Sequence, residues 1–426
     1  MSFLHSLIQL LRQCKRRVFQ RFYLAHRAVE WRRLRKSQED IHGTGGVFVI
    51  PCDPWSLTGS RGDEAMLIVL QRQFPQERFH VVTSTPEAAE AARRHGWIPV
   101  NCWSGRWLYE SIYNAAKAIR PTFCAVLGAD VMDGYYSPRS SVAFFALADI
   151  MQRHGIPTSL IGFSFNSHPH PWVLRCLRHV NADFVYRLRD PISLQRFEKA
   201  TGKRALLTAD AAFLLAPDTH SEQYALIQEW KRQSGQPLLA VNLHPMLFKN
   251  ATATQIAESV EALTKVLGDI LQKNDWNLLL LPHDDRPQVT DNICLGPLFE
   301  KLRPGFPNRI HYCAQVLDAP RIKGIVSLAD ALVTSRMHLG IAGLSQGIPT
   351  MGFSYQDKFL GMLAHFGFGG DFIIPPPVMP NCQQMVEQLR WLLEHAAEIH
   401  QGLLQKLPSV QELARRNFPP YSVDQI

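Results

Sequence analysis

The sequence predicts an α/β protein built from two doubly wound, Rossmann-like domains that face a cleft. Short apolar runs alternate with helix-like segments from residue 46 onward, which is typical of a parallel sheet covered by helices on both faces. The alternation stops once, at the polar stretch 216–236, and then restarts, so two such sheets are expected. A chain of 426 residues, 46% hydrophobic and 19% charged, has enough material for two globular cores.

The expected strands of the first domain are apolar runs that end in small or polar residues. They lie at residues 47–51, 79–83, 122–128, 158–165, 183–189 and 206–209. The helices that connect them are expected to begin near residues 63, 86, 106, 141, 171 and 191.

The second domain repeats the same alternation. Its expected strands lie at residues 238–243, 276–282, 310–313, 331–334 and 348–353, with helical connections near 254–273 and 319–327. Three consecutive prolines at 375–377 end this unit, and residues 383–414 have the pattern of one or two amphipathic helices. The predicted segments are an arm at 1–44, domains at 45–220 and 236–377, and C-terminal helices at 378–426.

The positive charge of the chain is concentrated in the N-terminal arm. Of 45 Lys and Arg and 37 Asp and Glu, residues 1–40 hold ten and three, so the arm carries +7 and the remainder only +1. Apolar residues from Leu4 to Phe22 fall on one helical face. Such a helix can lie on an anionic membrane, and the alternative is a helix that docks on this protein or a partner. Nucleic acid is not an expected partner, because the body is neutral and has no recognition motif.

The cysteine pattern and the hydropathy predict a cytoplasmic protein. The eight cysteines are scattered without a Cys-x-x-Cys pair, which favours buried free thiols over disulfides or zinc ligands. No apolar run is long enough to span a membrane, and the start lacks a secretory pattern. Contact with the inner face of the cell membrane is expected only through residues 1–40.

The strongest candidate site is Ser335-Arg336-Met337-His338, which follows one apolar run and precedes a helix-like stretch of small residues. This order places a fixed cation and a titratable imidazole at the C-terminal edge of a strand, beside a helix N-terminus. Ligands of open α/β sheets bind at that edge, and helix N-termini favour anions. The segment therefore predicts a site for an anionic small molecule that needs a proton.

Other polar residues follow neighbouring strands. Gly62 permits close backbone approach, and Asp63 and Glu64 after it can cap a helix or act in the site. Arg189 can hold a carboxylate or phosphate through two hydrogen bonds, although a surface salt bridge is the alternative. The further candidate binding residues are Asn166, His168, Asn242 and His283. No metal is expected, because no second ligand group has a suitable spacing.

Several short motifs occur in a set order between residues 47 and 370. They are Gly62-Asp63-Glu64-Ala65, Arg189-Asp190-x-x-Ser193, Thr208-Ala209-Asp210-Ala211-Ala212-Phe213, Ser335-Arg336-Met337-His338, Gly347-Ile348-Pro349 and Gly352-Phe353-Ser354-Tyr355-x-x-Lys358. As an ordered set they make the sequence similar to the polysaccharide pyruvyl transferase family. The basic arm lies outside this resemblance.

The resemblance implies a fold like that of B-type glycosyltransferases, with the donor bound by the second domain. It also implies that pyruvate moves from phosphoenolpyruvate to two hydroxyls of a saccharide, as a ketal, in exopolysaccharide or cell-surface polysaccharide biosynthesis. Phosphoenolpyruvate is then a co-substrate, no cofactor is expected, and the acceptor can be lipid-linked.

The resemblance also suggests roles for particular residues. His338 is the expected acid, Arg336 the cation that neutralises the leaving phosphate, and Asp63 the base for the acceptor. Arg189, Ser335, Met337 and Glu64 are expected to bind substrate. A nucleotide-sugar glycosyltransferase of the same fold and a non-catalytic saccharide-binding relative remain open as alternatives.

Overall fold

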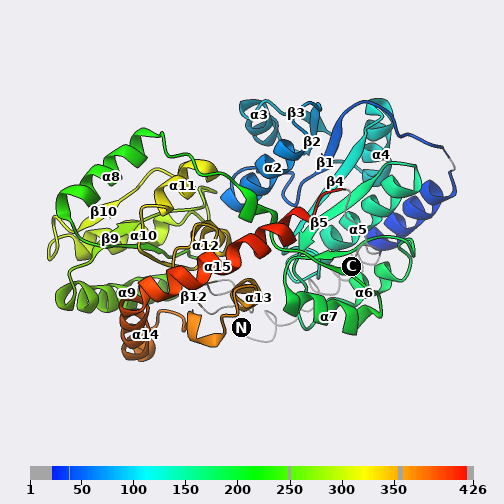
Figure 1. The fold of residues 1–426 in the computed structure, drawn as a ribbon. Coiled ribbons are helices and arrows are strands. Elements are labelled where there is room, and N and C mark those ends of the chain that lie inside the picture. Colours follow the sequence, from blue (N-terminus) through cyan, green and yellow to red (C-terminus); the bar gives the residue numbers. More distant parts are fainter. Residues whose placement is uncertain (1–21, 38, 248–250, 354–357, 420–426) are drawn as a thin grey trace, which may run out of the picture. The chain divides into compact units, whose positions relative to one another are not determined.

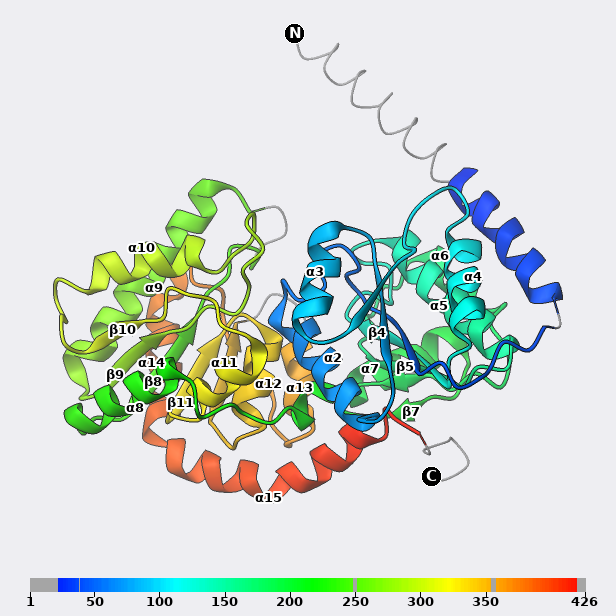
Figure 2. The same cartoon turned by 90° about the horizontal axis from the view of Figure 1, so that it is seen from above.

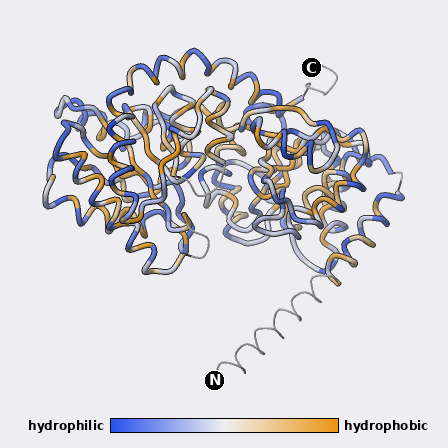
Figure 3. The backbone as a smooth tube through the Cα atoms, turned by 90° about the horizontal axis from the view of Figure 1, so that it is seen from below, coloured by the Kyte–Doolittle hydropathy of each residue, from blue (hydrophilic) through white to orange (hydrophobic). Residues whose placement is uncertain are grey.

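The computed structural model describes residues 22–37, 39–247, 251–353 and 358–419 (Figure 1). Two parallel sheets, each with helices between successive strands, make up the fold, so the predicted α/β class is confirmed. Apolar residues concentrate along the strands inside each sheet, and hydrophilic residues lie on the outer turns of the helices (Figure 3). The seven cysteines among the described residues are buried, as expected.

The first sheet has seven strands in the order β3-β2-β1-β4-β5-β6-β7. The strands are β1 (Val47–Ile50), β2 (Phe79–Thr83), β3 (Ile98–Asn101), β4 (Phe123–Ala129), β5 (Thr158–Phe163), β6 (Arg187–Leu188) and β7 (Leu206–Leu207). The helices along this part of the chain are α2 (Arg61–Gln73), α3 (Pro86–Arg94), α4 (Leu108–Ile119), α5 (Pro138–Arg153), α6 (Pro171–Leu177) and α7 (Pro191–Thr201). The short 3-10 helix η1 (Ala211–Leu214) follows β7.

The second sheet has the order β10-β9-β8-β11-β12-β13. Its strands are β8 (Leu238–Asn242), β9 (Asn277–Leu280), β10 (Ile310–Tyr312), β11 (Ala331–Thr334), β12 (Thr350–Phe353) and β13 (Ile373–Ile374). The helices are α8 (Glu222–Ser234), α9 (Ala253–Lys273), α10 (Asn292–Leu302), α11 (Ala319–Val326), α12 (Met337–Leu344), α13 (Lys358–Ala364), α14 (Cys382–Glu394) and α15 (Ala396–Arg415). In each sheet the strand order reverses once, between β1 and β4 and between β8 and β11.

Strands β3 and β13, helices α10 and α13 and the 3-10 helices were not expected from the sequence. Strand β3 contains Pro99, which weakens the strand signal, and it lies at the edge of its sheet, where proline is tolerated. Strand β13 has only two residues, and α10 contains Pro297 inside the helix. Strands β2 and β11 have the predicted bounds, whereas others, such as β5 and β6, are shorter than the runs that predicted them.

The contacts divide the chain into two compact units. Unit 1 comprises Met1–Trp55, Gln76–Leu160 and His168–Phe184, and unit 2 comprises Ser56–Pro75, Ile161–Ser167 and Val185–Ile426. Helix α2 and the residues at the end of β5 therefore group with the second sheet, although they follow strands of the first. All of the predicted site residues except His168 belong to unit 2.

Residues 22–36 form a helix that docks on unit 1. The buried Arg27 side chain donates hydrogen bonds to Glu30 at 2.6 Å and to the carbonyl oxygen of Arg106 at 2.7 Å. Trp31 donates its ring N–H to Asp149 at 2.8 Å. This part of the predicted arm therefore docks on the protein itself, which was the alternative to membrane contact. The apolar face predicted from Leu4 to Phe22 lies outside the described residues, except for Phe22 itself.

The C-terminal helix α15 ends beside strands of the first sheet that belong to unit 2 (Figure 2). The side chain of Asn417 accepts a hydrogen bond from the Gly162 N–H at 2.7 Å and donates one to the carbonyl oxygen of Ala209 at 2.8 Å. This asparagine is fully buried, and it holds the ends of β5 and β7 in place. These strand ends carry the residues described next.

Candidate functional site

The predicted residues of the second sheet gather where its strand order reverses. Strands β8 and β11 pair in parallel, so their carboxyl ends lie at the same edge of the sheet. Asn242 ends β8, and Ser335 and Arg336 follow β11 directly. Ligands of open α/β sheets bind at such a reversal point, outside the carboxyl ends of the strands.

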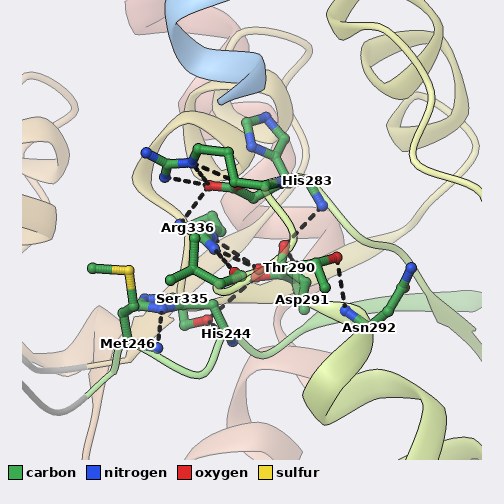
Figure 4. A network of polar contacts seen from close by, with 12 residues as sticks. His244, Met246, His283, Thr290, Asp291, Asn292, Ser335 and Arg336 are labelled. Atoms are coloured by element: carbon green, nitrogen blue, oxygen red, sulfur yellow. Dashed lines mark hydrogen bonds and ion pairs between the residues drawn. The ribbon is translucent and has the colours of Figure 1, made fainter. Parts of the chain in front are cut away.

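Arg336 is held by two carboxylates (Figure 4). Its Nε and Nη2 donate to Oδ1 of Asp291 at 2.9 and 2.7 Å, and its Nη1 lies 3.0 Å from Oδ2 of Asp284. Nη2 also donates to the carbonyl oxygen of Val289 at 3.0 Å. Burial alone would lower the pKa of the Arg336 guanidinium, but Asp291 and Asp284 raise it above its ordinary value. The guanidinium is charged and oriented, and only one N–H, on Nη1, is left over from these contacts.

The neighbouring predicted residues orient Asp291. Asn242 is completely buried and donates to Oδ2 of Asp291 at 2.8 Å, and the backbone N–H of His283 donates to the same oxygen at 2.8 Å. Ser335 donates its hydroxyl hydrogen to Asn242 at 3.3 Å. Burial, followed by the charges of His338 and Arg336, lowers the pKa of the His283 imidazole well below its ordinary value, so this ring is neutral. Asn242 and Ser335 therefore support Arg336 from inside the protein.

A second cluster joins Arg189, Asp210 and His338. Arg189 follows β6, Asp210 is the N-cap of η1, and His338 lies in the first turn of α12. Arg189 donates from Nε to the Ser164 hydroxyl at 2.7 Å and from Nη1 to Oδ2 of Asp210 at 2.9 Å. The same Asp210 oxygen lies 3.5 Å from Nε2 of His338.

This cluster contains one buried anion, Asp210, and two buried nitrogen atoms that lack a hydrogen-bond partner. Burial would raise the pKa of Asp210, but interaction with His338, and then with Arg189, lowers it below its ordinary range. Asp210 is therefore ionised, although it is buried. Among the described residues, the buried Nη2 of Arg189 and Nε2 of His338 have no hydrogen-bond partner. Buried donors of this kind are normally satisfied, so they indicate where a ligand oxygen binds.

Gly62 determines which nitrogen of His338 faces this cluster. A Cβ atom at Gly62 would lie 2.1 Å from Nδ1 of His338, so only glycine fits against the ring. The close backbone approach expected at Gly62 is therefore an approach to the imidazole. Because Nδ1 lies against helix α2, Nε2 is the nitrogen that faces Asp210.

The remaining predicted residues are less central. Glu64 is buried, and it accepts a hydrogen bond from the Ala319 N–H at 2.9 Å, which ties α2 to α11. Asp63 is half-buried in the first turn of α2, and Asn166 is half-buried after β5. His168 is exposed and belongs to unit 1. The structure thus brings His338 and Arg189 together through Asp210, and Arg336 together with Asn242, Ser335 and His283 through Asp291.

Four residues of these clusters were not among the sequence candidates. Asp284 and Asp291 hold Arg336, and Ser164 and Asp210 hold Arg189. Asp210 had a signal, since it lies in the motif Thr208–Phe213 directly after an apolar run. Asp291 is the N-cap residue of α10, but it meets its partner Arg336 only through the fold.

Two small cavities flank the first turn of α12. One is lined by Arg189, Asp210, Phe213, Met337, Met362 and His365 among others, and the second by Arg61, His283, Lys323 and His338. Each has a volume of about 10 Å³, which is room for roughly one water molecule. A larger anion therefore needs a movement of the surrounding side chains to enter. Within the described ranges, no group of three or more His, Cys, Asp or Glu side chains could hold a metal ion.

Comparisons with known proteins agree with the fold and with the motifs. The family model described as polysaccharide pyruvyl transferase matches residues 61–357. A putative UDP-N-acetylglucosamine 2-epimerase from Listeria monocytogenes is 13% identical, with a TM-score of 0.55 over 87% of this chain and 93% of that one. An S. aureus MnaA–UDP co-structure is 11% identical, with a TM-score of 0.57 over 87% and 94%.

A glycosyltransferase from Rickettsia africae is 9% identical, with a TM-score of 0.56 over 87% of this chain and 96% of that one. At such low identity these likenesses concern the fold, which is that of B-type glycosyltransferases and epimerases. No curated protein matches the sequence. None of the described helices is both long enough and apolar enough to cross a membrane.

Proposed function

The chain belongs to the polysaccharide pyruvyl transferase family, and from this premise we propose that it transfers pyruvate from phosphoenolpyruvate to a saccharide. The observation that carries the proposal is the buried cluster of Arg189, Asp210 and His338. It combines a permanent cation, a titratable imidazole and two unpartnered donor atoms within the matched region. A small anion with two acidic ends needs a cation and hydrogen-bond donors to bind it, and protonation of its carbon needs an acid such as an imidazole.

Phosphoenolpyruvate would bind through its acidic ends. Nη2 of Arg189 is available to its oxygens, and a guanidinium suits both carboxylate and phosphate. Nε2 of His338 faces the same space and carries the proton that is transferred. Arg336 would contribute its one remaining N–H and its positive charge. Because Asp284 and Asp291 already compensate that charge, Arg189 is the better candidate for the principal anion ligand.

His338 would act as the general acid from Nε2. The imidazolium gives its proton to C3 of the enol phosphate, and the positive charge that develops at C2 is shared with the oxygen that bridges C2 and phosphorus. An acceptor hydroxyl attacks C2, its proton passes to a base such as Asp63, and the C2–oxygen bond to phosphate breaks. A second hydroxyl then attacks C2 and closes the ketal, and its proton returns to the now neutral His338, so that inorganic phosphate is the other product. Proton transfer of this kind contributes roughly 10²–10⁴-fold.

The acceptor is proposed to be a free or lipid-linked saccharide of an exopolysaccharide or cell-surface polysaccharide, modified in the cytoplasm. Membrane contact through residues 1–40 would bring the enzyme to lipid-linked acceptors. Phe22, Val29, Arg32 and Lys36 are exposed on the docked helix, and together they form a mixed apolar and basic stripe. Such a stripe suits an anionic membrane surface.

The test is incubation with phosphoenolpyruvate and free or lipid-linked oligosaccharides, with detection of released phosphate and of an acid-labile ketal. We expect both products from the natural protein and neither from His338→Ala. The matched control is His220→Ala, an exposed histidine that is not a candidate site residue. No phosphate with any acceptor, together with no thermal shift by phosphoenolpyruvate, would refute the proposal. Release of nucleoside diphosphate from a sugar nucleotide would favour a glycosyltransferase instead.

A further inference from the structure

The first sheet has its own reversal point, and exposed aromatic rings follow the strands there. Strands β1 and β4 pair in parallel, with Ile50 opposite Val126, so the residues after each of them leave the sheet at the same edge (Figure 1). Trp55 follows β1, and Tyr135 and Tyr136 follow β4. All three belong to unit 1, and they are 48%, 40% and 48% exposed. Large aromatic side chains are usually buried, so their exposure at a ligand-binding edge needs a reason.

The two tyrosines form a right-angled pair with fixed rings. Their ring centroids lie 5.1 Å apart and the ring planes meet at 90°. The Tyr136 hydroxyl donates to Asp130 at 3.3 Å, and the backbone N–H of Tyr135 donates to Asp133 at 2.8 Å. Burial of the hydroxyl end and the Asp130 charge raise the pKa of Tyr136, so its hydroxyl remains protonated. Both residues are therefore partly exposed, while Tyr136 is held at its hydroxyl and Tyr135 at its backbone.

The loop that carries these rings is held in an unusual backbone conformation. Ala129, at the end of β4, has φ of 43°, a left-handed value that costs energy for a residue with a side chain. Gly134 has φ of 85°, and a Cβ there would lie 2.6 Å from Cβ of His170. The His170 N–H donates to the carbonyl oxygen of Asp133 at 2.8 Å. Strain of this kind persists where surrounding contacts enforce it, often at ligand sites.

Trp55 is held at the same edge by separate contacts. Its indole meets the ring of Trp103 edge-on, with centroids 6.0 Å apart, and its carbonyl oxygen accepts a hydrogen bond from Thr85 at 2.7 Å. Trp103 itself is buried. Trp55 after β1 and the tyrosine pair after β4 are thus each held by ring contacts, and all three side chains remain partly exposed to solvent.

We propose that Trp55, Tyr135 and Tyr136 form a platform on which sugar rings of the acceptor stack, with the half-buried Asp130 accepting hydrogen bonds from sugar hydroxyls. The identity of the ligand rests on the proposed function, which requires a saccharide. The rings themselves favour that ligand over a purely anionic one. The apolar C–H face of a sugar packs on an aromatic face, and its hydroxyls match neighbouring carboxylates, whereas the carboxylates of this loop repel an anion.

The test measures saccharide binding separately from pyruvyl transfer. Short gluco-, galacto- and manno-oligosaccharides are added to the full-length protein without phosphoenolpyruvate, and binding is followed by saturation-transfer NMR and titration calorimetry. We expect Tyr135→Ala and Tyr136→Ala each to weaken binding by about five- to tenfold, from the loss of one ring contact. Tyr136→Phe keeps the ring and should bind nearly as the natural protein does. The matched control is Leu226→Ala, a residue of α8 that is also 48% exposed.

The outcomes separate this inference from the proposed function. If no phosphate is released from phosphoenolpyruvate but the tyrosine variants still lose saccharide binding, the platform stands and the enzyme proposal fails. If pyruvyl transfer is found but the double variant Tyr135→Ala, Tyr136→Ala keeps its saccharide affinity, the platform is overturned. The absence of binding to every saccharide of the panel also counts against it. Circular dichroism of each variant checks that the loop substitutions leave the fold intact.

Discussion

Replacing Lys323 by methionine should stabilise this protein at neutral pH. Lys323 lies on α11, is 2% exposed, and has no ion-pair or hydrogen-bond partner for its amine among the described residues. Burial, with a smaller contribution from Arg72, lowers its pKa from 10.5 to about 7. Methionine has nearly the same length and volume, so it fills the same space without an ionisable group.

The size of the effect follows from that pKa. Each tenfold change in proton affinity corresponds to about 1.4 kcal/mol, so the lysine disfavours folding by about 4 to 5 kcal/mol at pH 7. Relaxation around the site reduces this, and we expect Lys323→Met to gain about 2–4 kcal/mol in the free energy of unfolding.

The pH dependence has a definite sign. Between pH 7 and 10.5 the unfolded chain binds a proton at Lys323 that the folded protein does not bind, so stability rises with pH through this window. The contribution is about 1.4 kcal/mol per pH unit and disappears in the variant.

The assay is urea unfolding of the natural protein and the variant, at pH 7 and near the upper end of the window. The difference between the two proteins should be largest at pH 7 and should shrink as the pH rises. Lys323→Leu serves as a second apolar replacement. A variant that is less stable at pH 7, or a difference that does not change with pH, would refute the reasoning.

Three further predictions concern the site and the arm. Gly62→Ala should lower pyruvyl transfer at least about tenfold in a steady-state assay, because its Cβ displaces the His338 ring. The helix propensity of this position changes by less than about 1 kcal/mol. Unchanged activity would contradict the contact between Gly62 and His338. Asp210→Asn should lower kcat by about 10²–10³-fold and the free energy of unfolding by about 3–5 kcal/mol, because it leaves Arg189 buried without its counter-ion; full activity would exclude the role of Asp210. Deleting residues 1–21 removes five basic and no acidic residues, and it should weaken sedimentation with anionic liposomes by about a hundredfold at low salt. Neutral liposomes serve as the control. Equal sedimentation of the two proteins with anionic liposomes would argue against membrane contact.

The sequence predicted those elements in which local pattern and tertiary environment agree. Buried parallel strands such as β8 and β11 are continuous apolar runs, and helix α9 after β8 begins at a capping box of Thr252 and Gln255. Strand β3 was missed because its proline and its exposed edge position remove the apolar signal. The candidates Arg189, Arg336 and His338 were found for a similar reason, since each lies directly after an apolar run.

What the sequence determined by itself was the two-sheet α/β fold, the family, and the strand ends at which polar residues collect. These depend on short-range periodicity and on the order of motifs along the chain. Only the tertiary structure decided what surrounds each charge. Asp291 reaches Arg336 across 45 residues and holds its guanidinium, and Asp210 joins Arg189 to His338, so the open donors are on those two side chains. Electrostatic partners are set by distance in space, and no local pattern in the chain encodes that distance.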